Sequence, residues 1–162
     1  MNKLSIRKIE LFTPRQERAI NMPRIYGFDP IIDSCSETVL LGTIPGPQSL
    51  SIGEYYADPH NQFWTIIEAV FNVPISGEYM KRRQYLLERN IAIWDVLESA
   101  ERLGVTDKGI TNATINDFHI FFCKYPTIKR VILLGNTAMT YYKKGIKTDK
   151  VPGSIPFKQV QS

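Results

Sequence analysis

The sequence predicts an α/β protein, a three-layer α/β/α sandwich with a central, mostly parallel sheet of roughly four strands. Short apolar runs without polar alternation are typical of strands that are covered on both faces. Segments with helical spacing of apolar residues lie between these runs, as in parallel sheets. The length of 162 residues fits one domain. We expect a single domain over 1–162, with a basic N-terminal segment at 1–26 and a mobile or truncated C-terminal loop at 145–162.

Three runs are the candidate strands. The first covers 38–41 and the last covers 130–134, and each is followed directly by glycine; Ile-Ala-Ile-Trp at 91–94 is the third. In open parallel sheets, ligands bind beyond the carboxyl ends of the strands, in the loops that follow them. The loop after the first strand is therefore the first place to look for a site.

Four segments have the pattern of helices. In 63–71, apolar residues recur at intervals of three and four and form one stripe: Phe63, Ile66, Ile67, Val70 and Phe71. The segments 79–89, 116–125 and 136–144 are the other candidates. Asn116 and Asn136 stand at helix starts, where an asparagine side chain can cap the first turn.

Composition excludes several classes of protein. Hydrophobic residues make up 43% and charged residues 22% of the chain, which is a globular and not a disordered profile. No run approaches the ~18–20 apolar residues of a membrane helix, and the first 25 residues mix charges of both signs, unlike a signal peptide. Cys35 and Cys123 have no CxxC spacing, so we expect two free, partly buried thiols and no metal site.

The net charge of +4 is unevenly distributed. Residues 1–26 carry six Lys or Arg and two acidic residues, residues 27–123 carry six and thirteen, and residues 124–162 carry eight and one. Basic ends on an acidic body suit a protein that binds a polyanion on one face, because neutralised phosphates release counterions. A solvated lysine-rich tail is the alternative interpretation.

The loop after the first strand is unusually long and specialised. Connections in α/β units usually have about 2–6 residues, and longer ones are more often functional. Gly42 and Gly46 allow the backbone to approach a ligand or another segment closely, while Pro45 and Pro47 stiffen the loop. The loop has neither GxxxxGK[ST] nor GxGxxG, which argues against a nucleotide-triphosphate enzyme.

The same loop carries a resemblance to a known family. It reads Gly-Thr-Ile-Pro-Gly at 42–46, Ser-Leu at 49–50 and Tyr-Tyr-Ala-x-Pro-x-Asn-x-Phe-Trp at 55–64. This pattern resembles the first motif region of the uracil-DNA glycosylase superfamily, and most closely its hypoxanthine (deoxyinosine) DNA glycosylase branch. Similar segments follow at 93–97, 116–118 and 132–138, and Gly-Phe-Asp-Pro-Ile-Ile-Asp at 27–33 resembles the usual lead-in. The likeness extends from about residue 27 to 140.

The chain departs from the superfamily pattern at three places. Thr43 and Ile44 stand where many members have an Asp or Asn that positions the attacking water. Asp58 replaces a histidine before the proline. The second motif, a loop that wedges into DNA, is matched only loosely by Val-Pro-Gly-Ser-Ile-Pro at 151–156.

The resemblance implies a uracil-DNA glycosylase-like fold and a DNA repair glycosylase of base excision, which hydrolyses the N-glycosidic bond of a deaminated base flipped out of the duplex. Asn61 takes the place of the branch's functional asparagine, and an amide can both donate to and accept from a base edge. We expect Asn61, with the loop backbone at Gly42 and Thr43, to act catalytically. The predicted base pocket is completed by Ile44, Pro45, Gly46, Tyr56 and Phe63. Predicted DNA contacts are Ser49, His60, Asn136, Lys143, Lys144, Pro152, Gly153, Ser154 and Ile155.

Several of these residues have a simpler interpretation. Asn61 can be a helix cap ahead of Phe63, and His60 can be an ordinary surface residue. Tyr55 and Tyr56 alternate in an extended loop, so we expect only one of them, Tyr56, to face the pocket. Asp95 ends a candidate strand at the same sheet edge, where it can orient water or cap a helix.

Three functions remain open from the sequence. The first is a monofunctional hydrolase without cofactor or metal, acting on hypoxanthine or, second, on uracil; the loop offers no amine nucleophile for a lyase. The second is a catalytically inactive DNA-binding relative, favoured by Thr43 and Ile44. A small-molecule hydrolase on the same fold is the third. For the glycosylase we expect a monomer that binds double-stranded DNA containing a damaged base, contacts no membrane, and is cytoplasmic or nucleoid-associated.

Overall fold

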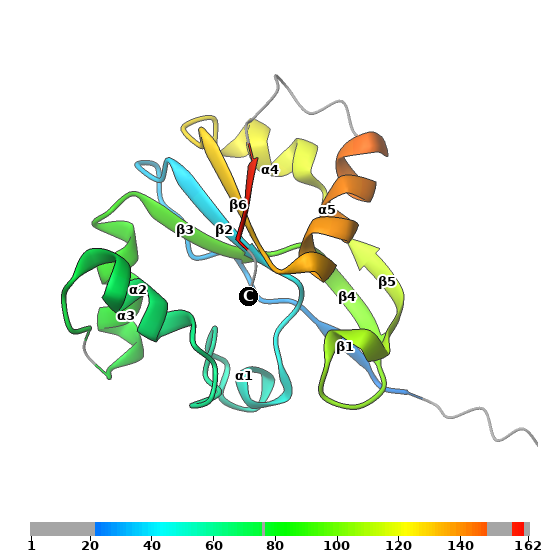
Figure 1. Cartoon of the computed structure of the whole chain (residues 1–162). Helices are drawn as coiled ribbons and strands as arrows, with labels where there is room; N and C mark the ends of the chain where they lie inside the picture. The colour runs from blue at the N-terminus through cyan, green and yellow to red at the C-terminus, as the bar shows by residue number, and fades with distance from the viewer. Residues whose placement is uncertain (1–21, 76, 149–156, 161–162) are drawn as a thin grey trace, which may run out of the picture.

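A computed structural model describes residues 22–75, 77–148 and 157–160 (Figure 1). Most of the basic segment 1–26 and the predicted wedge residues 152–155 lie outside this description. Among the described residues, no helix combines the length and apolar character needed to cross a bilayer. Cys35 and Cys123 are free, as expected, but both are exposed instead of partly buried.

The central sheet is parallel, and its strands run in the order β3 (Ile91–Asp95), β2 (Thr38–Gly42), β6 (Arg130–Leu134) and β7 (Phe157–Val160). The predicted α/β class is confirmed, and the three predicted strands are present. All five residues of β2 are buried, as the unbroken apolar run requires. Gly42 is paired with Asp95 at the carboxyl ends of β2 and β3, which places both residues at one edge of the sheet.

Helices cover both faces of this sheet (Figure 1). Val39 and Leu41 share a buried cluster with α4 (Phe118–Lys124) and α5 (Asn136–Thr148). Leu40, between them, shares a second cluster with α2 (Phe63–Phe71) and α3 (Tyr79–Leu87). The division follows from the strand period of two, which sends successive side chains to opposite faces.

A second sheet was not predicted. It is antiparallel, with β4 (Leu97–Arg102) between β1 (Arg24–Tyr26) and β5 (Ile110–Ile115). The mixed polar and apolar sequence of β4, Leu-Glu-Ser-Ala-Glu-Arg, has no apolar run by which to recognise it. The connection between β4 and β5 contains a 3₁₀ turn, η1 (Asp107–Gly109).

Two local predictions about helices were wrong. In α2 the buried residues are Phe63, Trp64 and Ile67, whereas Ile66 and Val70 are 52% and 68% exposed, so the inward face is narrower than the predicted stripe. The cap of α4 is Asp117, whose Oδ1 accepts from the Ile120 N–H at 2.8 Å, and not Asn116. The long loop after β2 also contains a short helix, α1 (Pro47–Ile52).

Candidate functional site

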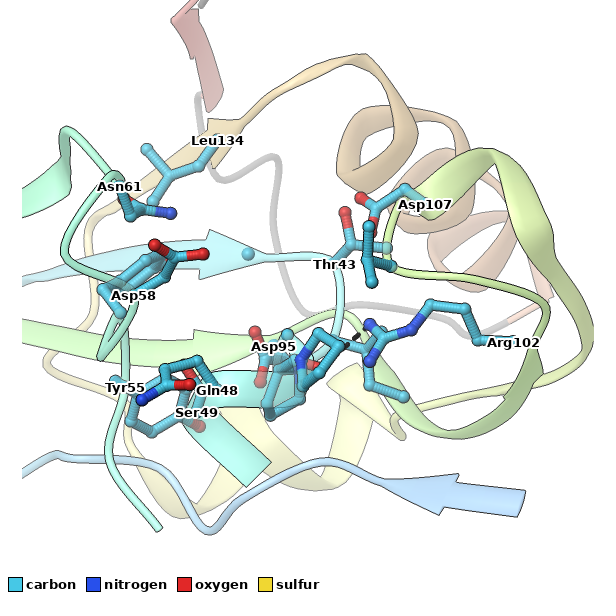
Figure 2. A pocket seen from close by; sticks show the side chains of 17 residues that line it. Thr43, Gln48, Ser49, Tyr55, Asp58, Asn61, Asp95, Arg102, Asp107 and Leu134 are labelled. Atoms are coloured by element: carbon cyan, nitrogen blue, oxygen red, sulfur yellow. Dashed lines mark hydrogen bonds between the residues drawn. The ribbon is translucent and has the colours of Figure 1, made fainter. Parts of the chain in front are cut away.

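A cavity of about 540 Å³ lies at the carboxyl edge of the parallel sheet (Figure 2). Gly42 of β2, Asp95 of β3 and Leu134 of β6 contribute to its lining, so three strand ends meet there. Figure 2 shows Asn61 and Asp58 on one side and Arg102 and Asp107 on the other. Eight of the predicted site residues line this cavity: Gly42, Thr43, Ile44, Pro45, Gly46, Ser49, Tyr56 and Asn61.

Gly42 lies in the floor of the cavity, where its backbone closely approaches two polar side chains. A Cβ at this position would lie 2.7 Å from the Asp95 Oδ1 atom and 2.9 Å from the Tyr56 hydroxyl oxygen. Real Cβ contacts are longer than this, so only glycine allows the two polar groups to converge here. Gly46 differs, because a Cβ there would meet open space and its φ is an ordinary −69°.

Asp95 is the most deeply buried acidic side chain of the cavity, with 3% of its surface exposed. Among the described residues, its Oδ2 atom has no hydrogen-bond partner. Burial, and to a smaller extent the nearby charge of Asp107, together raise the pKa of this carboxyl from 3.8 to about 8. Asp95 does not cap a helix, because β4 follows almost directly. Its backbone carbonyl accepts from Asn116 Nδ2 at 2.9 Å, which is the role of that asparagine.

The loop at 43–46 leaves backbone donors beside the cavity. Within the described part of the chain, the N–H groups of Thr43, Ile44 and Gly46 donate to no acceptor. The loop is held instead through its carbonyls: Thr43 O accepts from the Leu97 N–H at 3.0 Å, and Pro45 O accepts from Arg102 Nη1 at 2.9 Å. These N–H groups can therefore donate to a ligand while the carbonyl hydrogen bonds continue to hold the loop in place.

Both tyrosines of the loop line the cavity, contrary to the expectation that only Tyr56 would. Tyr56 reaches it through a left-handed backbone with φ +54°, which breaks the simple alternation assumed from the sequence. Its hydroxyl is buried without a partner among the described residues, and burial raises its pKa well above the ordinary value. Tyr55 is anchored by its hydroxyl, which donates to Phe28 O and Asp29 O, each at 3.3 Å.

Phe63, which the sequence predicts for the base pocket, does not line this cavity. It is buried at 8% exposure and stacks on Tyr56 with ring centroids 3.8 Å apart. It therefore supports the wall from behind. This position follows from the start of α2, which directs the first helical residue into the core.

Asn61 lies at the rim, and its side chain has two distinct ends. The cap position of α2 is occupied by Gln62 and not by Asn61, but the Asn61 Oδ1 atom accepts from the N–H of Phe63, the first helical residue, at 2.9 Å. That hydrogen bond fixes the amide orientation and leaves Nδ2, which has no acceptor among the described residues, as a donor. Asn61 lines the cavity, and Figure 2 shows its amide nitrogen turned over it.

The predicted DNA contacts divide into three groups. Ser49 is 5% exposed, and its hydroxyl accepts from the Ala57 N–H at 3.2 Å. It therefore connects α1 to the following loop and does not face outward. His60 is exposed beside the cavity, with Nδ1 3.2 Å from Asp58 Oδ1. Asn136 begins α5 next to the Leu134 edge, and exposed Lys143 and Lys144 lie about two turns further along that helix.

The β4–β5 hairpin supplies a side of the cavity that no sequence pattern predicted. Arg102, Val105 and Asp107 all line it. Burial lowers the pKa of Arg102, and Asp107 counters part of that effect. No local signal marks these residues, because they reach the site only through the unpredicted antiparallel sheet. The described residues contain no group of three or more His, Cys, Asp or Glu side chains placed to hold a metal ion.

Known proteins are similar to this chain in sequence and in architecture. A protein named hypoxanthine DNA glycosylase from Methanosarcina barkeri (strain Fusaro / DSM 804) is 32% identical over 116 residues, which are 71% of this chain and 73% of the relative. The chain belongs to the hypoxanthine DNA glycosylase family. A relative of the same name from Methanosarcina acetivorans is 28% identical over 133 residues, covering 79% of this chain and 84% of its own.

A solved structure of the same fold accords with this membership. The solution NMR structure of a candidate uracil DNA glycosylase from Methanosarcina acetivorans superposes with a TM-score of 0.69 at 26% identity, over 78% of each chain. No protein-family model matches the sequence. The suspected superfamily and its hypoxanthine branch are thereby confirmed, and family membership supports a DNA glycosylase.

Proposed function

We propose that this chain is a monofunctional DNA glycosylase that hydrolyses the N-glycosidic bond of hypoxanthine flipped out of double-stranded DNA. The observation that carries the proposal is the pairing of Asn61 Nδ2 at the rim with unused backbone N–H groups at the sheet edge, around one cavity. Its volume of about 540 Å³ lies within the roughly 300–1,000 Å³ of small-ligand sites. The names of the family members support hypoxanthine ahead of uracil.

The residues act by stabilising the departing base. The bond from the sugar C1′ to the base nitrogen breaks with its electron pair moving to the base, and the sugar becomes oxocarbenium-like. Asn61 Nδ2 and the N–H groups of Thr43 and Ile44 donate to the base as this negative charge builds. Water adds its hydroxyl to C1′, and its remaining proton neutralises the base. Each preorganised donor of this kind contributes on the order of 3–4 kcal/mol to the barrier reduction.

The proposed DNA contacts lie on the loop that carries Asn61 and along α5. His60 is exposed at the rim on the loop that carries Asn61, where it can contact a phosphate. The first turn of α5 at Asn136 lies at the same sheet edge, and helix N-termini favour phosphate. Lys143 and Lys144 add positive charge to the exposed surface of that helix. We propose that a monomer binds the duplex through these groups.

The test is a panel of duplex oligonucleotides that each carry one deoxyinosine, deoxyuridine or undamaged deoxyadenosine. The purified chain is incubated with each, and abasic sites are revealed by alkaline cleavage. We expect cleavage at deoxyinosine, less at deoxyuridine and none at deoxyadenosine. Absence of product from every duplex, with tight and salt-sensitive binding retained, would instead identify a DNA-binding relative without hydrolytic activity.

A further inference from the structure

Asp95 is a buried polar group to which the proposed bond cleavage assigns no role. Its carboxyl lines the cavity from the end of β3, is 3% exposed, and has an Oδ2 atom with no partner among the described residues. A buried polar atom without a hydrogen-bond partner destabilises the folded state. The cavity geometry points to a ligand as the missing partner.

The groups that face Asp95 do not supply a counter-charge. Tyr55 and Tyr56 present hydroxyls, and Asp107 of η1 and Asp58 of the loop are acidic. Arg102 of β4 lines the same cavity, but its guanidinium donates to Pro45 O, and no ion pair joins it to Asp95. An unpaired buried carboxylate is strongly disfavoured, and burial raises the pKa of Asp95 to about 8. At neutral pH the side chain is therefore predominantly the neutral acid.

A neutral carboxylic acid has an O–H donor next to a C=O acceptor. Deamination of a purine creates a lactam edge, with a ring N–H donor next to a carbonyl acceptor, and the two edges are complementary. We propose that Asp95, in its neutral form, reads the lactam edge of the deaminated base, donating to the base carbonyl and accepting from the ring N–H. This inference rests on the proposed function and adds the residue that recognises the base.

The opposite role for the same carboxyl is proton acceptor for the attacking water, which requires the ionised form. The two roles predict opposite pH dependences. A neutral reader loses activity as pH rises through its pKa, whereas a proton acceptor gains activity over the same range. Asn in place of Asp also separates them, because an amide keeps a donor and an acceptor but cannot take up a proton at these pH values.

The experiment measures single-turnover release of hypoxanthine from a deoxyinosine duplex between pH 6 and pH 9.5, using the wild type, Asp95→Asn and Glu98→Gln. Glu98 is an exposed acid on neighbouring β4, so its variant controls for the change in net charge. We expect the wild-type rate to fall about tenfold from pH 7 to pH 9, as the acid ionises. Asp95→Asn should be several-fold slower at pH 7 but change little with pH, and Glu98→Gln should follow the wild type.

The ratio of wild type to Asp95→Asn removes the ionisation of the base itself, since both enzymes meet the same substrate. Identical pH profiles for these two proteins would overturn the inference and leave the proposed function standing. A wild-type rate that rises with pH, with no release by Asp95→Asn, would assign Asp95 as the proton acceptor instead. No release by any protein at any pH would overturn the proposed function, and the base-reading role with it.

Discussion

The rim and the floor of the cavity hold their polar groups in different ways. At the rim, Asn61 is exposed, lies on a loop, and uses half of its amide to start α2. At the floor, Asp95 is buried in a strand end, fitted against Gly42, and has an unsatisfied oxygen. Replacing the rim side chain therefore affects stability only through its hydrogen bond to the start of α2. The floor group is fixed by sheet register, so we expect changes there to affect stability and pH dependence together.

The largest expected effect is at the rim. Asn61→Ala removes the Nδ2 donor, and we expect the single-turnover rate of hypoxanthine release to fall by about 10²–10³-fold. The same variant also loses the Oδ1 bond to the Phe63 N–H, at a cost of about 1 kcal/mol in unfolding free energy. Urea denaturation checks this second value, and a rate within threefold of the wild type would contradict the rim assignment.

At the floor, Gly42→Ala tests the close approach. The new Cβ would lie 2.7 Å from Asp95 Oδ1 and 2.9 Å from the Tyr56 hydroxyl, so the two groups must move apart. We expect a loss of roughly 10-fold to 100-fold in the excision rate and a destabilisation of about 1–3 kcal/mol. If Gly42→Ala loses activity with no change in unfolding free energy, the claim that the floor couples activity to stability is contradicted. Gly46→Ala, where a Cβ meets open space, is the matched control for stability.

The floor also predicts a pH-dependent stability. Because burial holds the pKa of Asp95 near 8 in the folded state, above the ordinary 3.8, the folded chain binds this proton more tightly than the unfolded chain. Its contribution is fully present below about pH 4 and is lost as pH rises to about 8. Asp95→Asn should therefore gain stability over the wild type between pH 5 and pH 8, on the order of a few kcal/mol. Urea denaturation midpoints of both proteins at pH 5 and pH 8 measure this gain. A stability difference between the two proteins that is the same at both pH values would refute it.

Tyr56 links the two regions, and its hydroxyl is buried without a partner among the described residues. Tyr56→Phe removes that oxygen and keeps the ring stacked on Phe63. We expect an increase of about 1 kcal/mol in unfolding free energy. A decrease, measured by thermal or urea denaturation, would show that the hydroxyl has a partner.

The smallest effect is expected at His60. Its side chain is 94% exposed, and its contact with Asp58 is a surface pair of small energetic value. His60→Ala should raise the Kd for duplex DNA by about twofold to threefold at low salt and less at high salt. Fluorescence anisotropy at two salt concentrations measures this change, and an equal loss at both would indicate a contact other than a screened charge.

The same contrast explains what the sequence could predict. Apolar runs identified β2, β3 and β6, and the rule that ligands bind beyond parallel strand ends located the cavity. The hairpin that carries Arg102 and Asp107 was missed because β4 mixes polar and apolar residues without a regular period, and their burial depends on neighbours distant in sequence. Tyr55 was misjudged because the positive φ of Tyr56 breaks the assumed alternation. Backbone strain and long-range pairing of this kind leave no local pattern.

The central claim is that the Asn61 amide donates to the departing base, and Asn61→Asp tests it most directly. This variant keeps an oxygen for the Phe63 N–H, so the helix start is preserved, and it replaces the Nδ2 donor with a negatively charged carboxylate oxygen that can only accept. The measurement is the single-turnover rate of hypoxanthine release from a deoxyinosine duplex, with unfolding free energy recorded in parallel. We predict a loss as large as that of Asn61→Ala, in a protein as stable as the wild type. A rate equal to that of the wild type would contradict the account.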